Sequence, residues 1–323
     1  MKRIAVLTSG GDGPGLNPCI RAVVRTAIDK GLEVKGVRRG YAGLIDCDLI
    51  DLNARSVGGI LNRGGTFLGT ARAPEFRTKQ GQREALRNLN QMGIEGLIVA
   101  GGNGSLTGAL QLHKLGFPVI GIPATIDNDV NGTDISIGVD TTLNTILDAV
   151  DKIKDTASSH ERAFLIEVMG RDSGYLALMA GISSGAELVL TPEVAISVQE
   201  VTQAIDDAYI RGKAHCIIIV AEGWEPDART LCDYLKERHE KIGFDVRLTV
   251  LGHVQRGGSP SAYDRYLATR LGAAAVRALV DGQSGMMIGI IKNSPGLTPL
   301  EEAVAFQKKL NPELYELAKV MEQ

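Results

Sequence analysis

The stretch IAVLTSGGDGPGLNPCIRAVVRTA, residues 4–27, decides the fold class of this chain. Its first part, Ile4 to Thr8, is apolar enough for a buried strand, and Asn17-Pro18 offers a capping residue and a first-turn proline for the helix that follows. Four glycines lie between the two elements, where they let the backbone approach a ligand, and a helix N-terminus favours an anion. Because a plain βα turn needs only one or two glycines, we interpret this loop as a phosphate-binding turn.

The same alternation of strand and helix continues to the end of the chain, with helical spacing of apolar residues in stretches such as 143–153. Near-continuously apolar strands are typical of parallel sheets that helices cover on both faces. The pattern of residues 4–15 has a weaker counterpart at 164–174, so we expect an α/β fold of two similar doubly wound lobes with mostly parallel sheets. The strand predictions are residues 4–8, 34–37, 97–100, 119–122, 164–168, 216–221, 248–251 and 286–291.

Composition excludes several classes of function. The 323 residues carry 35 basic and 38 acidic side chains, a net charge of -3, so no broad basic surface for nucleic acid is expected. No apolar run approaches the roughly 20 residues that cross a membrane, and the apolar stretch Ile4 to Leu7 is too short for a signal peptide. The four cysteines lie far apart, which predicts reduced thiols and a cytoplasmic location.

Two further segments follow predicted strands and carry chemistry. Residues 101–105 read GGNGS, a second glycine turn, and residues 123–129 read PATIDND, which places Asp127 and Asp129 behind the hydroxyl of Thr125. Carboxylates can hold a metal or take a proton, and the carboxyl ends of parallel strands meet at one edge of a sheet. We therefore expect these loops to converge on one crevice that moves a phosphoryl group. The spacing matches neither the dinucleotide fingerprint nor the GxxxxGK[ST] phosphate loop.

Arginines and a histidine accompany these loops. Residues 62–72, NRGGTFLGTAR, place Arg63 and Arg72 among small residues, where they would either neutralise a transferring phosphoryl group or lie solvated on the surface. His253 and Arg256 follow another strand and could bind a phosphate ester, although a lone histidine beside a strand is more often structural.

The segments LTSGGDGPGLN, NRGGTFLGTAR, GGNGS, PATIDND, SSHER, VMGR, VAEG and LGHVQRGGSP resemble, in this order, the bacterial 6-phosphofructokinases over nearly the entire chain. The resemblance implies transfer of the γ-phosphoryl group of ATP to the 1-hydroxyl of fructose 6-phosphate, with Mg²⁺, in a glycolytic homotetramer whose sites are shared across subunits. It also implies a larger ATP-binding lobe, residues 1–138 plus 252–303, and a smaller sugar-phosphate-binding lobe, residues 139–251 plus 304–323.

The resemblance assigns the chemical step and the nucleotide side. Asp127 resembles the base that takes the proton from the sugar hydroxyl, and Thr125 and Arg72 resemble stabilisers of the phosphoryl group, with Arg171 close by. The residues expected on the nucleotide side are Gly11, Tyr41, Arg72, Ala73, Arg77, Gly102, Asn103, Gly104, Ser105 and Gly108.

The sugar phosphate is expected to contact both the PATIDND segment and the later motifs. Arg162 and Arg247 would reach it from a neighbouring subunit. The remaining residues of this set are Thr125, Ile126, Asp127, Met169, Gly170, Arg171, Glu222, His253, Val254, Gln255 and Arg256.

An effector site for ADP and phosphoenolpyruvate is also implied. Arg21 and Arg25 stand four apart and so share one helix face. Ala54 stands where the family commonly has an arginine and Lys154 replaces another, so effector binding is expected to be weaker or altered. The other positions that match this site are Gly185, Glu187, Arg211, Lys213 and His215.

Two positions near the donor depart from the family. Asn103 replaces the aspartate of GGDGS, which removes a negative charge from the metal site and leaves Asp129 as the carboxylate for Mg²⁺. Ala124 stands where ATP-users carry glycine and pyrophosphate-users carry lysine, whereas Gly104 favours ATP. Two alternatives therefore stay open: a catalytically weakened paralogue that acts as a sensor or regulatory subunit, and an enzyme with an altered phosphoryl donor.

Overall fold

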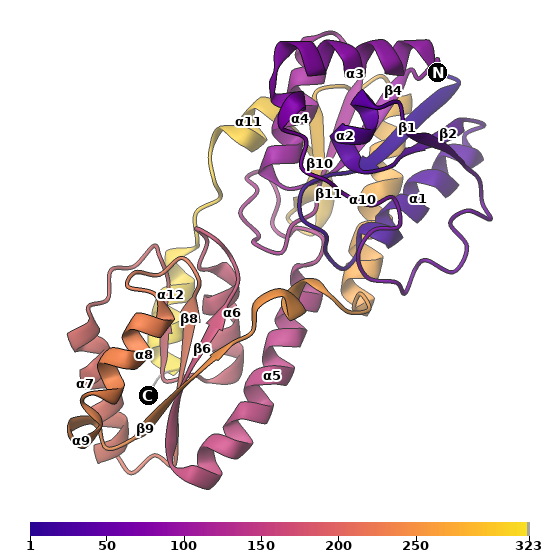
Figure 1. Cartoon of the computed structure of the whole chain (residues 1–323). Coiled ribbons are helices and arrows are strands. Elements are labelled where there is room, and N and C mark those ends of the chain that lie inside the picture. The colour runs from indigo at the N-terminus through magenta and orange to yellow at the C-terminus, as the bar shows by residue number, and fades with distance from the viewer. Residues whose placement is uncertain (322–323) are drawn as a thin grey trace. The chain divides into compact units, whose positions relative to one another are not determined.

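The computed structural model describes residues 1–321, which form two compact units. Unit 1 comprises residues 1–141 and 256–308, and unit 2 comprises residues 142–255 and the chain from Lys309 onward. Each unit has its own sheet, so each is described separately (Figure 1).

Unit 1 is built on a seven-stranded sheet of order β11-β10-β5-β4-β1-β2-β3. The five inner strands run parallel, and the two edge strands, β3 and β11, pair antiparallel. A glycine-rich loop follows β1, and the segments that carry chemistry follow β4 and β5. The strands are β1 (Arg3–Thr8), β2 (Glu33–Val37), β3 (Leu49–Leu52), β4 (Gly96–Gly101), β5 (Val119–Pro123), β10 (Met286–Ile291) and β11 (Ser294–Pro299).

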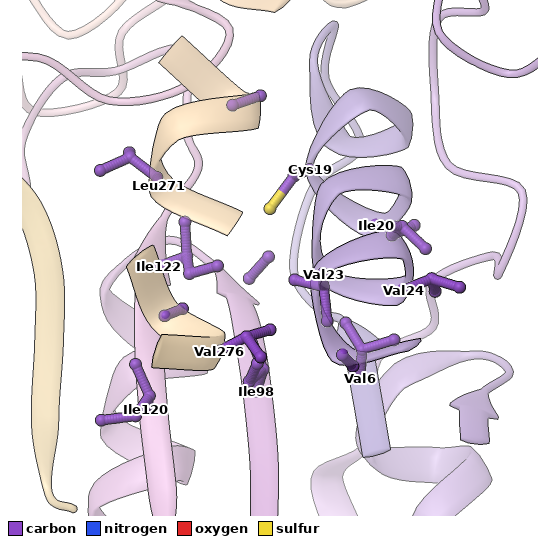
Figure 2. Close-up of a cluster of buried hydrophobic side chains, with 14 of the residues drawn as sticks. Val6, Cys19, Ile20, Val23, Val24, Ile98, Ile120, Ile122, Leu271 and Val276 are labelled. Atoms are coloured by element: carbon purple, nitrogen blue, oxygen red, sulfur yellow. The ribbon is translucent and has the colours of Figure 1, made fainter. Parts of the chain in front are cut away.

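Helices cover both faces of this sheet because successive side chains of its strands point to opposite sides. In β1, Ile4 and Val6 join one core with α1 and α10, whereas Ala5 and Leu7 join a second core with α2, α3, α4 and α11. Figure 2 shows the first core, where side chains of α1 and α10 pack onto β1, β4 and β5. The helices are α1 (Leu16–Asp29), α2 (Gly40–Ile45), the 3₁₀ turn η1 (Pro74–Arg77), α3 (Lys79–Gln91), α4 (Asn103–Lys114), α10 (Ala262–Val280) and α11 (Leu300–Ala305).

Unit 2 is a smaller version of the same design, with a four-stranded parallel sheet of order β7-β8-β6-β9. One face carries a core shared with α7, α8 and α9, and α6 packs on β8 and against α12. Its strands are β6 (Arg162–Val168), β7 (Leu188–Leu190), β8 (Cys216–Ala221) and β9 (Asp245–Val250). Its helices are α5 (Val139–His160), which starts within unit 1, α6 (Tyr175–Ser184), α7 (Val198–Ile210), α8 (Ala228–Lys236), α9 (His239–Ile242), α12 (Pro312–Met321) and the 3₁₀ turn η2 (Gly252–Arg256) at the boundary.

The predicted fold class is confirmed, and so are all the predicted strands, with small shifts at their ends. The largest shift is at β9, which begins at Asp245 and ends before Leu251. Three strands were not predicted: β3 and β7 have only four and three residues, and β11 is an edge strand that contains two prolines.

The predictions for the Asn17 cap and for the cysteines have different outcomes. The expected capping role of Asn17 is wrong, because Gly15 is the N-cap residue of α1 and Asn17 lies buried inside the first turn. The four cysteines are free thiols, three of them buried. No helix in residues 1–321 is long and apolar enough to cross a membrane.

Candidate active site

Three loops of unit 1 meet at the carboxyl ends of β1, β4 and β5. The Ser9 N–H donates to the Ala100 carbonyl at 3.0 Å, and the Ala124 N–H donates to the Gly101 carbonyl at 3.0 Å. A Cβ atom at Gly101 would lie 2.5 Å from both the Ser9 carbonyl and Ser105 Oγ, so only glycine fits where the loops touch. The structure thus brings the two glycine loops and the PATIDND segment together.

Asp127 and Thr125 lie at the centre of this junction. Asp127 is buried, with 4% exposure, and its N–H donates to Thr125 Oγ1 at 3.3 Å. A Cβ atom at Gly102 would come within 3.4 Å of the Thr125 Cβ, which places the hydroxyl against the second glycine loop. Asn128 adopts a left-handed conformation, φ 49°, and its side chain accepts the Ser136 N–H at 3.0 Å, which fixes the turn that presents Asp127.

Asn103 and Asp129 form a direct pair beside them. Asn103 Nδ2 donates to the Asp129 carboxylate at 2.9 Å, while Asn103 Oδ1 is buried and has no hydrogen-bond partner within the described part of the chain. An amide oxygen and a carboxylate are ligands that suit Mg²⁺, which commonly takes one or two protein oxygens together with phosphates and water. These two residues fit such an ion, although residues 1–321 contain no cluster of three or more His, Cys, Asp or Glu that would cage a metal.

The glycine loops present backbone N–H groups. Across residues 1–321, no hydrogen bond from the N–H groups of residues 11–13, or of Asn103 and Gly104, is observed. Arg256 lies against the first loop, where its Nη1 donates to the Asp12 carbonyl at 3.3 Å and would overlap a Cβ atom at Gly11. The open N–H groups, the start of α4 and the guanidinium together favour an anion.

Polar side chains hold residues 62–72 against the first glycine loop and the start of α1. Asn17 accepts the Phe67 N–H at 2.8 Å and donates to the Arg63 carbonyl at 3.0 Å. Thr70 Oγ1 donates to the Gly10 carbonyl at 2.7 Å. These anchors hold the backbone beside the first glycine loop and leave the Arg63 and Arg72 side chains exposed.

Tyr41, predicted on the nucleotide side, packs against the second glycine loop and the start of α4. Its hydroxyl donates to the Ser105 carbonyl at 2.6 Å, and its ring stacks on Phe76 with centroids 4.0 Å apart. Burial raises the pKa of Tyr41 well above its usual value, so the phenol remains a donor. Gly108 packs on this ring, whereas Arg77 is exposed and Ala73 is partly buried just before η1.

The predicted sugar-phosphate residues 162, 169–171, 222, 247 and 253–255 belong to unit 2, whereas Arg256, Thr125, Ile126 and Asp127 belong to unit 1. In unit 2, the Met169 N–H donates to Gln255 Oε1 at 3.2 Å. The Gly170 and Arg171 N–H groups both donate to Glu222 Oε1, at 3.1 and 2.7 Å. His253 and Val254 are exposed on η2.

Asp245 is a residue that sequence reasoning missed. Its Oδ2 forms an ion pair with Arg162 Nε at 3.3 Å and accepts a hydrogen bond from Arg247 Nη2 at 2.6 Å, so one carboxylate aligns both arginines. The sequence contained a signal for this contact, because Asp245 and Arg247 are two apart on one strand and so lie on the same face.

Asp264 was missed as well. It is fully buried and accepts the Gly138 and Thr141 N–H groups, both at 2.8 Å, which anchors the start of α5. Burial raises its pKa against the opposing effect of these hydrogen bonds. Its partners are more than 120 residues away in sequence, so no local pattern reveals it.

The predicted effector residues of unit 2 gather around the end of α6 and the start of β8. Glu187 pairs with Lys213 at 3.2 Å and accepts the Ile217 N–H, while His215 Nδ1 lies 2.8 Å from Ser158 Oγ. Lys154 Nζ donates to the Ser184 carbonyl, next to Gly185 at the end of α6. Arg211 ends α7 and is exposed.

Arg21 and Arg25 lie on α1 of unit 1. Burial and the neighbouring Arg25 charge lower the pKa of Arg21, which agrees with two cations on one helix face.

Known proteins resemble this chain over its whole length. The phosphofructokinase family model matches residues 3–279. The chain is 53% identical to the ATP-dependent 6-phosphofructokinase of Thermotoga neapolitana, covering 99% of this chain and 100% of the relative. It is 50% identical to the enzyme of the same name from Clostridium acetobutylicum, over 99% of each chain.

Solved structures agree with these relatives. Phosphofructokinase from Saccharomyces cerevisiae superposes with a TM-score of 0.87 and 39% identity, covering 100% of this chain and 47% of the yeast chain. A pyrophosphate-dependent phosphofructokinase from Marinobacter aquaeolei shares the fold, with a TM-score of 0.85 at 22% identity over 99% of this chain and 91% of that chain. The chain belongs to the phosphofructokinase family.

Proposed function

We propose that the protein is an ATP-dependent 6-phosphofructokinase, which transfers the γ-phosphoryl group of ATP to the 1-hydroxyl of fructose 6-phosphate. The observation that carries this proposal is the junction of the two glycine loops with the PATIDND segment, where Asp127 and Thr125 lie beside open backbone N–H groups. The names of the full-length relatives support the same donor and acceptor.

The residues divide the chemical work as phosphoryl transfer requires. The open N–H groups of the glycine loops and the N-terminus of α4 bind the phosphates. Asp127 takes the proton of the sugar hydroxyl while the hydroxyl oxygen bonds to the γ-phosphorus. The bond between the γ-phosphorus and the β-phosphate oxygen breaks, which releases ADP. Thr125 and Arg72, with Arg171, neutralise the charge on the transferring group.

A magnesium ion would be held by Asp129 and Asn103 Oδ1. When bound, it would supply positive charge that neutralises the phosphates. The hydrogen bond from Asn103 keeps the Asp129 carboxylate in place, and Asn103 contributes no negative charge of its own.

The protein surroundings favour ATP as the donor. A Cβ atom at Gly104 would meet nothing within 4 Å, so the chain leaves space there for a nucleotide phosphate. Ala124 is only 6% exposed, so its methyl group packs inward and adds no charge for pyrophosphate.

Unit 2 supplies most of the sugar-phosphate set. Arg162 and Arg247, aligned by Asp245, present two guanidinium groups suited to a phosphate ester. We place these two arginines at the site of a neighbouring subunit in a cytoplasmic homotetramer, with ADP or phosphoenolpyruvate at the effector residues.

Initial rates of ADP release test the proposal, with ATP, Mg²⁺ and fructose 6-phosphate as reactants. Turnover of about 1–100 s⁻¹ that requires the sugar is expected. A folded protein that shows no sugar-dependent ADP release at any pH or with any metal ion tested contradicts the proposal. Faster turnover with pyrophosphate than with ATP rejects ATP as the donor.

A catalytically weakened paralogue is the second candidate. The Asn103–Asp129 pair favours it, because the Asn103 amide already hydrogen-bonds to the carboxylate that would hold Mg²⁺. Asn103→Asp, alone and with Ala124→Gly, separates the two. A rise in kcat of about a hundredfold, roughly 3 kcal/mol of barrier, supports the paralogue. Ordinary kinase rates in the unchanged protein rule out the weakened paralogue.

A further inference from the structure

Lys308, the last residue of unit 1, contacts the segment that carries the proposed magnesium carboxylate. Its N–H donates to the Asp129 carbonyl at 3.0 Å, and the neighbouring Gln307 forms an antiparallel bridge with Val130. Its ammonium group donates to the Asp134 carbonyl. A single residue therefore binds both ends of the loop that begins at Asp129 and ends at Asp134.

The Asp134 carbonyl links this contact to the turn that presents Asp127. Asn128 Nδ2 donates to the same carbonyl at 3.4 Å, and Asn128 Oδ1 accepts the Ser136 N–H at 3.0 Å. Asn128 is only 1% exposed and has a left-handed φ of 49°, so its side chain fixes the backbone between the two aspartates. The Lys308 ammonium and the Asn128 amide thus share one acceptor, since a carbonyl oxygen has two lone pairs.

The charge of Lys308 is costly at this position. Its side chain is partly buried, and removing an ammonium group from water is unfavourable. Burial lowers the pKa of Lys308, and the charge of Asp134 opposes this shift. An apolar side chain of similar length would fill the same space without that cost. The hydrogen bond to the Asp134 carbonyl, and not packing, therefore accounts for a lysine here.

We propose that Lys308 is a positioning residue that acts through Asp129: its N–H and its ammonium fix the loop 129–134 and so set the position of the Asp129 carboxylate. Because Asp127 lies two residues earlier, its position relative to the sugar hydroxyl is set as well. Asn103 Nδ2 binds the Asp129 carboxylate at 2.9 Å, so the backbone and the side chain of this aspartate are held by different residues. The inference rests on the proposed function for the identity of the reaction and of the ion.

The experiment removes the ammonium group. Lys308→Met keeps an unbranched side chain of nearly the same length. Because losing a group that orients a metal ligand typically costs about 10- to 100-fold in activity or metal affinity, kcat is expected to fall by about that factor. The Kd for Mn²⁺ in the presence of ATP, measured by electron paramagnetic resonance, is expected to rise about tenfold. Lys308→Arg keeps a cationic donor and should recover most of both values.

Asn131→Ala is the matched control. Asn131 lies in the same loop, and its Nδ2 donates to the Glu302 carbonyl at 3.2 Å, so this variant also loses one side-chain hydrogen bond to a backbone carbonyl. A merely structural role of Lys308 predicts that both variants lose similar stability and keep the kcat and the Mn²⁺ affinity of the parent. The positioning role predicts that only Lys308→Met loses kcat and Mn²⁺ affinity.

Hydrogen–deuterium exchange of the ligand-free protein gives a readout that does not depend on activity. Lys308→Met is expected to speed exchange in peptides that cover residues 127–136, and Lys308→Arg is not. An inactive parent contradicts the proposed function and leaves exchange to decide whether Lys308 holds the loop.

In an active enzyme, parent-like kcat and Mn²⁺ affinity in Lys308→Met would overturn the inference, and so would unaltered exchange at 127–136. If Lys308→Met does not fold, Lys308→Gln decides by the same criteria, because its shorter side chain still carries a donor.

Discussion

The glycine loops of unit 1 and the 169–171 turn of unit 2 use the same backbone chemistry in opposite ways. In unit 1, within residues 1–321, the N–H groups of residues 11–13 make no hydrogen bond to the chain. In unit 2, the three successive N–H groups of 169–171 are bound by Gln255 and Glu222. The difference teaches that the backbone of unit 1 is prepared to bind an anion, whereas the backbone of this turn in unit 2 is held by side chains of the chain itself.

The largest effect is expected at Asp127, because its proposed role is proton removal in the chemical step and not binding of the sugar phosphate. Asp127→Asn keeps the size of the side chain and removes the base, so kcat should fall by about a thousandfold or more while sugar affinity is largely retained. Steady-state kinetics, with sugar affinity from equilibrium binding, check this. Equal losses of kcat and of affinity would mean that the role is misassigned.

Gly104→Ala tests whether the second glycine loop receives a phosphate. The protein leaves open space at this Cβ position, so the melting temperature should not change. A phosphate bound at the loop would meet the new methyl group, and the KM for ATP is expected to rise about tenfold. Thr107→Ala, on an exposed position of the same helix, serves as the control. An unchanged KM for ATP would show that no phosphate of ATP binds at this loop.

Gly170→Ala is the counterpart in unit 2 and should behave differently. A side chain there overlaps the Ser173 carbonyl at a strained φ, so stability is expected to fall by about 1–3 kcal/mol. The value of kcat should fall several-fold, because Arg171 is displaced, while the KM for ATP is unaffected. Denaturant unfolding and kinetics measure both. A variant as stable as the parent would contradict the strain assigned to this turn.

Glu167→Gln is expected to give the smallest change. Burial raises the pKa of Glu167, with the charges of Glu222 and Asp227 adding to the shift and Arg229 opposing it. The ionised form is therefore disfavoured in the folded state, and its penalty grows as pH rises from 4.5 through the raised pKa. The glutamine variant should be slightly more stable at neutral pH, within about 0.5 kcal/mol because the group is partly exposed, and the gain should vanish in acid. Melting temperatures across pH check the sign, and a gain that grows in acid would contradict it.

The sequence predicts most of the fold because buried parallel strands carry continuous apolar runs that need no partner to be recognised. It also predicts the loops around Gly101 and Asp127, since turns that follow neighbouring strands must meet at one edge. Contacts made by single side chains across long separations leave no such trace. Asp264 holding Gly138, and Glu222 holding Arg171, depend on pairs of residues 126 and 51 positions apart.

Hydrogen–deuterium exchange without ligands, and then with ATP and Mg²⁺, tests the contrast between the two units most directly. Addition of ATP and Mg²⁺ is expected to slow exchange in peptides covering 10–15 and 101–106, because open N–H groups gain phosphate acceptors. Exchange at 169–171 is expected to be slow in the free protein already, because Gln255 and Glu222 bind these donors. Rapid exchange at 169–171 in the free protein, and no new protection at the glycine loops with ATP, would contradict the account.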